Sequence, residues 1–274
     1  PEDLGLLLDG GSHAWKSWAC RRGSAGRIRL GCYLKSREPI TNGDKPMAAN
    51  IPRYLIENHG PDIEGIKTAF AGAFQVCQQA GITQITLIVP AKGTFPDTVV
   101  GSFLGSAASK ALCNGQSVRI SDTISMNLES VKTFSLHGTY GMVIGIYLSE
   151  KDHQVLDSIR RASAIVLLPW TEDEGKAWMA TWSPTVLGAS TWCVPTGGLP
   201  KEVEDALLVL TRGINLSTGL SHPSDKESAK RTLTAIRKAG HRPDADEIRR
   251  WAVRHDWAPR DADDLAKLAA RIIK

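Results

Sequence analysis

Four carboxylates are placed as candidate catalytic groups: Glu150, Asp152, Glu172 and Asp173. Gathered at one site with Asp9, they can coordinate Mg²⁺, a hard cation that takes oxygen ligands and supports phosphoester hydrolysis. Alternatively, one carboxylate can activate water during cleavage of a glycosidic bond while Trp170 stacks on a sugar or base. The four acids also fit a structural role, because each stands where a helix is expected to begin, and acids stabilise helix starts by about 0.3–1 kcal/mol.

A second set of residues suits phosphate binding. Residues 90–97, PAKGTFPD, place a lysine and a glycine between an expected strand and an expected helix, where backbone N–H groups can face an anion. Neither GxGxxG nor GxxxxGKS/T occurs there, so the stretch supports neither dinucleotide nor Walker-type binding. The predicted ligand-binding residues are Lys35, Arg37, Lys92, Gly93, Thr94, Ser149 and Trp170.

Other catalytic and metal-binding signatures are absent from the sequence. The seven histidines include no HExxH, and the five cysteines form no CxxC pair. Residues 101–105, GSFLG, have the wrong spacing for a serine nucleophile turn and fall inside an expected helix. Neither a zinc motif nor a disulfide framework is predicted, and a reducing cytoplasm is the simplest interpretation of the cysteines.

The candidate residues need a scaffold that brings strand ends together. In residues 141–170, two short apolar strands, 143–148 and 164–168, flank a helix with Val155, Leu156 and Ile159 on one side. This is the pattern of a βαβ crossover. Ligands bind outside the carboxyl ends of parallel strands, so the residues that follow these strands are expected to converge on one edge of a sheet.

The same alternation extends along the chain. We expect further strands at residues 27–35, 82–89, 116–120 and 126–134, and helices at 62–80, 97–112 and 172–182. Residues 36–62 contain four prolines and are expected to form a long irregular loop. After Pro200 the pattern is entirely helical, at residues 203–210, 229–239, 245–253 and 262–273.

Together these patterns predict an α/β fold. A Rossmann-like, three-layer, mostly parallel sheet is expected over residues 1–195, followed by a small all-helical C-terminal module over residues 196–274. The chain has 274 residues and 42% hydrophobic content, enough for one large or two modest cores. It contains no run of about 18 apolar residues, and its first residues lack the basic region of a secretory signal. We therefore expect a soluble, cytoplasmic protein that does not contact a membrane.

The C-terminal module suggests an alternative function. Arg249, Arg250 and Arg254, interleaved with Trp251, can form a basic face for nucleic acid or anchor a protein partner. Seven acidic residues lie on either side of this stretch, between residues 244 and 264. Mixed charge of this kind is usually a solvated helix surface, with Trp251 as a packing anchor. The net charge of +4 permits contact with phosphates but does not require it.

Two functional hypotheses follow. In the first, the protein binds, and in one version hydrolyses, a nucleotide-like or phosphorylated ligand at the carboxyl ends of its strands, with Mg²⁺ as a candidate cofactor. In the second, it is a non-catalytic accessory module that contacts nucleic acid or a protein partner through its basic, tryptophan-containing helical tail.

Overall fold

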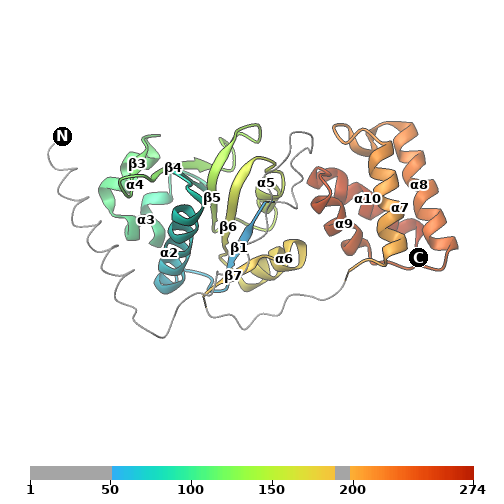
Figure 1. Ribbon diagram of the computed structural model, residues 1–274, viewed down its shortest axis with the longest axis horizontal. Helices are drawn as coiled ribbons and strands as arrows, with labels where there is room; N and C mark the ends of the chain where they lie inside the picture. The colour runs from blue at the N-terminus through green and yellow to red at the C-terminus, as the bar shows by residue number, and fades with distance from the viewer. Residues whose placement is uncertain (1–50, 189–197) are drawn as a thin grey trace.

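A sheet of seven strands forms the centre of the computed structural model, which describes residues 51–188 and 198–274 (Figure 1). The strand order is β3-β4-β2-β5-β6-β1-β7. All neighbouring strands are parallel except β3, which runs antiparallel to β4 at one edge. The strands are β1 (Arg53–Ile56), β2 (Gln84–Val89), β3 (Val118–Arg119), β4 (Ser125–Ser130), β5 (Tyr140–Ile146), β6 (Ala162–Leu168) and β7 (Thr185–Leu187).

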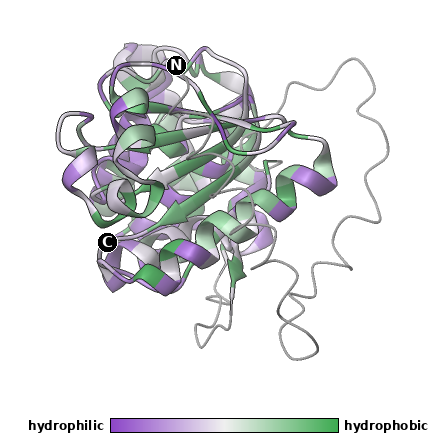
Figure 2. Cartoon of the chain, turned by 90° about the vertical axis from the view of Figure 1, so that its left-hand side faces the viewer, coloured by the Kyte–Doolittle hydropathy of each residue, from purple (hydrophilic) through white to green (hydrophobic). Residues whose placement is uncertain are grey.

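Helices cover both faces of this sheet. On one face, α2 (Ile63–Ala80), α3 (Val99–Leu104) and α4 (Ser106–Cys113) share a hydrophobic cluster with inward residues of the strands, such as Leu87. On the other face, α5 (His153–Asp157) and α6 (Glu172–Trp182) pack Leu156 and Trp178 against residues such as Val143. The central strands are accordingly coloured mainly as hydrophobic (Figure 2). The predicted α/β fold with a mostly parallel, three-layer sheet is confirmed.

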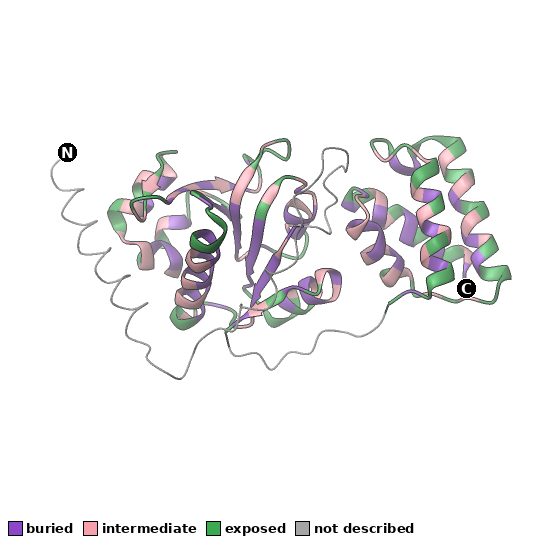
Figure 3. Cartoon of the chain, in the orientation of Figure 1, coloured by how far each residue is buried: buried purple, intermediate pink, exposed green. Residues whose placement is uncertain are grey.

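The C-terminal helices have a hydrophobic cluster of their own. They are α7 (Lys201–Gly213), the 3₁₀ turn η3 (Gly219–Ser221), α8 (Pro223–Lys238), α9 (Ala245–Arg254) and α10 (Pro259–Ile272). Their inner faces are buried and their outer faces exposed (Figure 3). The predicted helical module is thereby confirmed as an architecture, while the boundary between residues 195 and 196 stays a prediction.

The helical module contacts the α/β part through α9, which packs against α6. Arg160, in the turn between α5 and β6, adds a polar connection. Its Nε lies 3.1 Å from Asp256 Oδ1, and its Nη2 donates to the carbonyl oxygen of Trp257 at 3.4 Å. None of the described helices is both long enough and apolar enough to span a membrane.

Local sequence signals explain where the main helices begin and end. Asp62 caps α2 by accepting hydrogen bonds from the N–H groups of Glu64 and Gly65. The helix ends at Gly81, whose φ of 67° lies in the left-handed region that glycine adopts without strain. Helix α6 begins with a reciprocal capping box between Thr171 and Glu174. These two helices match the helices expected at residues 62–80 and 172–182.

Three expectations were wrong. The helix expected at residues 97–112 is divided into α3 and α4, because Gly105 adopts a φ of 91° between them. The loop expected at residues 36–62 contains β1, a buried strand of four residues that pairs with β6 and β7. Strand β7 was not expected at all, since three residues are too few to show a periodic pattern. The strand expected at residues 27–35 lies outside the described residues.

Candidate functional site

The residues that follow β2, β5, β6 and β1 lie in that order along one edge, because these four strands are neighbours and parallel. The chain leaves β2 toward β4 and leaves β5 toward β6, on opposite sides. The carboxyl ends of β2 and β5 thus form a topological switch point, the usual place for a ligand crevice in an open α/β sheet. Lys92, Tyr147 and Trp170 follow three of these strands.

Tyr147 is the most unusual residue of this edge. Its φ is 53°, in the left-handed region, which is strained for a bulky side chain. Its ring meets Trp170 edge to face with centroids 5.0 Å apart, and its hydroxyl has no hydrogen-bond partner among the described residues. Burial, helped by the Asp62 carboxylate, raises the pKa of Tyr147 to about 12, so the hydroxyl keeps its proton at neutral pH. Trp170 is 47% exposed.

The turn after β1 approaches the same place. Gly60 has a φ of 68°, and a Cβ at this position would lie 3.7 Å from the carbonyl oxygen of Trp170. Asn58 Nδ2 donates to Asp62 Oδ2 at 2.6 Å, which fixes the carboxylate that caps α2. The N-terminus of α2 is therefore already occupied by a carboxylate of the protein, that of Asp62.

At the end of β2, Lys92 reaches across to β4. Its Nζ lies 3.0 Å from Glu129 Oε2, and its carbonyl accepts a hydrogen bond from Cys113 Sγ at 3.2 Å. Gly93 faces open space, since a Cβ there would meet no atom within 4 Å. Thr94 Oγ1 donates to the carbonyl oxygen of Ala91 at 3.3 Å, which closes the turn.

The four predicted catalytic carboxylates are not gathered at this edge. Asp152 accepts a hydrogen bond from Ser149 Oγ at 2.7 Å. Glu172 pairs with Lys176 one turn along α6, and the hydrogen bond from this lysine lowers the pKa of Glu172. Asp173 belongs to the first turn of α6, so it stabilises the helix start. Within residues 51–188 and 198–274, no three His, Cys, Asp or Glu side chains are grouped as metal ligands. Lys35, Arg37 and Asp9 lie outside these residues.

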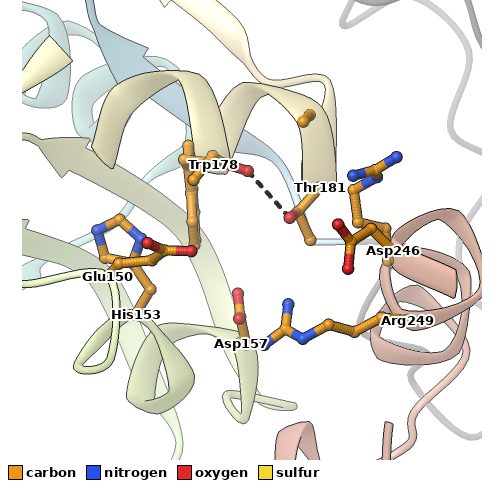
Figure 4. Close-up of a pocket in the computed structure, with 10 residues that line it drawn as sticks. Glu150, His153, Asp157, Trp178, Thr181, Asp246 and Arg249 are labelled. Atoms are coloured by element: carbon orange, nitrogen blue, oxygen red, sulfur yellow. Dashed lines mark hydrogen bonds between the residues drawn. The ribbon is translucent and has the colours of Figure 1, made fainter. Parts of the chain in front are cut away.

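Glu150, the fourth carboxylate, lines a different cavity. This cavity of about 270 Å³ lies between α5, α6 and α9, and we call it the junction pocket (Figure 4). Its lining residues are Glu150, His153, Asp157, Ala177, Trp178, Ala180, Thr181, Asp246, Arg249 and Arg250. The pocket brings Glu150 together with Arg249 and Arg250. The sequence patterns had assigned Glu150 to the catalytic hypothesis and the two arginines to the nucleic-acid hypothesis.

Asp157, which lines the junction pocket, belongs to a cluster with Trp182 and Arg53. Asp157 is 5% exposed, and its Oδ1 accepts a hydrogen bond from Trp182 Nε1 at 2.7 Å. The Arg53 guanidinium stacks on the same indole, 3.3 Å from the ring centre. Burial raises the pKa of Asp157 to about 6 and lowers that of Arg53 to about 9. In Figure 4 the side chain of Arg249 extends toward Asp157 from the opposite wall.

The other predicted nucleic-acid residues are less accessible than expected for such a role. Trp251 is 1% exposed and stacks on His255 with ring centroids 3.9 Å apart, as a packing anchor would. Arg249 Nε is paired with Asp263, and burial lowers the pKa of Arg254. Arg250 makes no ion pair with a described residue.

Sequence reasoning missed Tyr147, His153, Asp157 and Trp178. Tyr147 looks like an ordinary strand residue, since nothing in its type signals a left-handed backbone. The other three lie within short helices, and the pocket that they line with Arg249 and Arg250 exists only because α9, a segment far along the chain, packs against α6.

Comparison with known proteins adds one finding. A family described as "Domain of unknown function (DUF1889)" matches residues 199–274, the helical module, which is less than half of the chain. No match was found among curated proteins or among solved structures.

Proposed function

We propose that the protein binds a nucleotide-like or phosphorylated small molecule across the carboxyl ends of β2, β5 and β6. The observation that supports this most is the pair formed by Tyr147 and Trp170 beside the switch point. A strained backbone persists only where its surroundings enforce it, and such residues cluster at functional sites. Here the strain holds a tyrosine against a half-exposed tryptophan at the edge where α/β proteins bind ligands.

The edge offers a different chemistry at each strand end. The exposed face of Trp170 suits stacking of a base or another flat ring, which is worth about 1–3 kcal/mol per base. The Tyr147 ring meets Trp170 edge to face and so supports this stacking surface from one side. Lys92 and the open turn at Gly93 and Thr94 suit a phosphate, although part of the lysine charge is balanced by Glu129.

The positions of these residues support ligand binding at this edge but do not support hydrolysis of the ligand. Asp152 and Glu172 are engaged by Ser149 and Lys176, and Glu150 lines the junction pocket. The basic tail carries no second proposal, because Trp251 is buried and Arg249 is already paired.

The proposal is tested by titrating the full chain with adenosine and guanosine monophosphates in isothermal calorimetry. Trp170→Ala removes the stacking surface and Lys92→Gln the charge, and each is expected to weaken binding about tenfold or more. Val209→Ala, at a 70% exposed position on α7, and Lys267→Gln, at an exposed ion pair on α10, are the matched controls. Binding that is absent in the wild type, or unchanged in both site variants, would contradict the proposal.

A further inference from the structure

The loops at the carboxyl edge of the sheet carry a charge opposite to that of the whole chain. They are residues 57–62 after β1, 90–97 after β2, 129–133 at the end of β4, 147–152 after β5 and 169–174 after β6. Together they contain nine acidic residues and three lysines, Lys92, Lys132 and Lys151, which is a net charge of −6. The net charge of the chain is +4. The edge assigned to the ligand is therefore an acidic surface on a basic protein.

Two of these carboxylates lie beside the stacking surface of Trp170. Glu174 Oε2 accepts hydrogen bonds from the N–H groups of Trp170 at 2.9 Å and of Thr171 at 3.0 Å. Burial, and next the charge of Asp62, raise the pKa of Tyr147, so the Asp62 carboxylate lies near this tyrosine. Neither carboxylate makes an ion pair with a lysine or arginine of the described residues. A phosphate placed beside the Trp170 ring would meet both negative charges.

Lys92 lies two strands away from this surface. It follows β2, Trp170 follows β6, and β5 runs between them. Neighbouring strands are about 4.8 Å apart, so the two strand ends are separated by roughly 10 Å. The ring and the phosphate of one nucleoside monophosphate can span this distance. A ligand that stacks on Trp170 can thus place its first phosphate at Lys92.

A second phosphate has no such place. On the far side of Lys92, the carboxylate of Glu129 on β4 lies 3.0 Å from the lysine Nζ. Thr133 Oγ1 donates a hydrogen bond to this carboxylate at 2.5 Å and holds it there. Lys92 is therefore flanked by negative charge on the β4 side and on the Trp170 side. A chain of phosphates that extends in either direction is repelled.

The backbone donors that often bind phosphates are also engaged. Phosphate groups are held by free N–H groups at the start of a helix. At the start of α2, Asp62 accepts from the N–H groups of Glu64 and Gly65. At the start of α6, the capping box between Thr171 and Glu174 engages the N–H groups in the same way.

We infer that the ligand of this edge carries no more than one phosphate. Its chemical class is a nucleoside monophosphate or a similar flat-ring monophosphate, and di- and triphosphates are rejected by the acidic loops. This inference rests on the proposed function, because it defines the substrate class of the same site. Like charges brought together at a binding surface are a common means of rejecting the wrong partner.

The test compares ligands that differ only in phosphate number. The full chain is titrated in isothermal calorimetry with AMP, ADP and ATP, and in parallel with GMP, GDP and GTP, in the presence of EDTA. In the series that binds, the di- and triphosphates are each expected to bind at least about tenfold more weakly than the monophosphate. Raising NaCl from about 50 mM to about 500 mM should narrow this ratio at least about threefold, because salt screens the repulsion.

Two variants test the origin of the preference. Glu129→Gln removes the carboxylate beyond Lys92, and Asp62→Asn removes a charge near Trp170 while asparagine still caps α2. Each is expected to narrow the ratio of monophosphate to triphosphate affinity at least about threefold. Glu227→Gln, which breaks an exposed ion pair with Lys230 on α8, and Asp244→Asn, at the start of α9, are the matched controls and should leave the ratio within about twofold of the wild type. The melting temperature of each variant shows that it is folded.

Failure of this inference is distinguishable from failure of the proposed function. If the monophosphate binds and Trp170→Ala weakens it, the proposed function holds. The inference alone is then overturned if the triphosphate binds as tightly as the monophosphate, or if neither salt nor the two variants change the ratio. Absence of binding by every nucleotide overturns both.

Discussion

Asp157 is the only carboxylate side chain that is buried within the described residues, and its surroundings determine when it ionises. Burial is the largest influence and raises its pKa to about 6, against the opposing effects of the Trp182 hydrogen bond and of Arg53, Arg249 and Arg160. The folded chain thus retains a proton that the unfolded chain, with a pKa near 3.9, has already released. The free energy of unfolding contributed by this group is complete below about pH 4 and is lost as the pH rises through 6.

Asp157→Asn should remove this dependence. The variant keeps an oxygen acceptor for Trp182 Nε1 but cannot ionise, so the wild type should lose on the order of 2 kcal/mol relative to the variant between pH 4 and 7. Urea unfolding of both proteins at these pH values measures the difference, with Asp122→Asn at an exposed turn as the control. A difference between wild type and variant that stays constant with pH would show that Asp157 is not perturbed.

At the scale of single elements, α3 packs closely against the 3₁₀ turn η2 (Phe95–Asp97) through Gly101. A Cβ on Gly101 would lie 2.1 Å from the carbonyl oxygen of Phe95, a backbone atom that cannot turn aside. Gly101→Ala should therefore displace α3 and lower the free energy of unfolding by roughly 1–3 kcal/mol. Chemical denaturation measures the effect. Gly213→Ala, at the open end of α7, should be neutral or slightly stabilising; equal effects of the two substitutions would rule out the contact as the cause.

The elements that could be predicted from sequence are those long enough to show a periodic pattern of apolar residues and a residue that marks where the element ends. Helix α2 has eighteen residues, an apolar stripe and Gly81 at its end. Strands β1 and β7 have four and three residues and therefore no readable period. The candidate site residues likewise divide into those that a local pattern predicts and those that only tertiary packing brings together. The strand-end rule located Lys92, Ser149 and Trp170, whereas the meeting of Glu150 with Arg250 depends on the packing of α9 against α6, which no local pattern encodes.

At the scale of the whole molecule, Arg160 connects the two parts. Its guanidinium binds both Asp256 and the Trp257 carbonyl oxygen, and it is attached to the sheet through the turn before β6. Arg160→Gln should loosen the contact of the helical module without unfolding either hydrophobic cluster. We expect amide hydrogen exchange in residues 245–258 to be faster by about five- to tenfold, the effect of losing hydrogen bonds to a charged group.

The next residue, Arg161, provides the control for the hydrogen-exchange measurement. Arg161 is exposed and makes no ion pair with a described residue, so Arg161→Gln has the same charge change without the contact. Exchange in residues 245–258 should match the wild type in this variant. Equal acceleration in both variants would indicate a general electrostatic effect of the lost charge and not a connection through Arg160.

The place of β1 in the sheet has a consequence for how the chain folds. Tyr54 lies beside Val166 on one side and Thr185 on the other, so the first strand of the described chain is flanked by its last two. During synthesis β1 leaves the ribosome long before β6 and β7 are made. The backbone N–H and C=O groups that β1 pairs with these strands therefore stay unpaired until then. Contacts of such sequence separation slow folding. The half of the sheet that carries Trp170 can therefore be completed only near the end of synthesis of the α/β part.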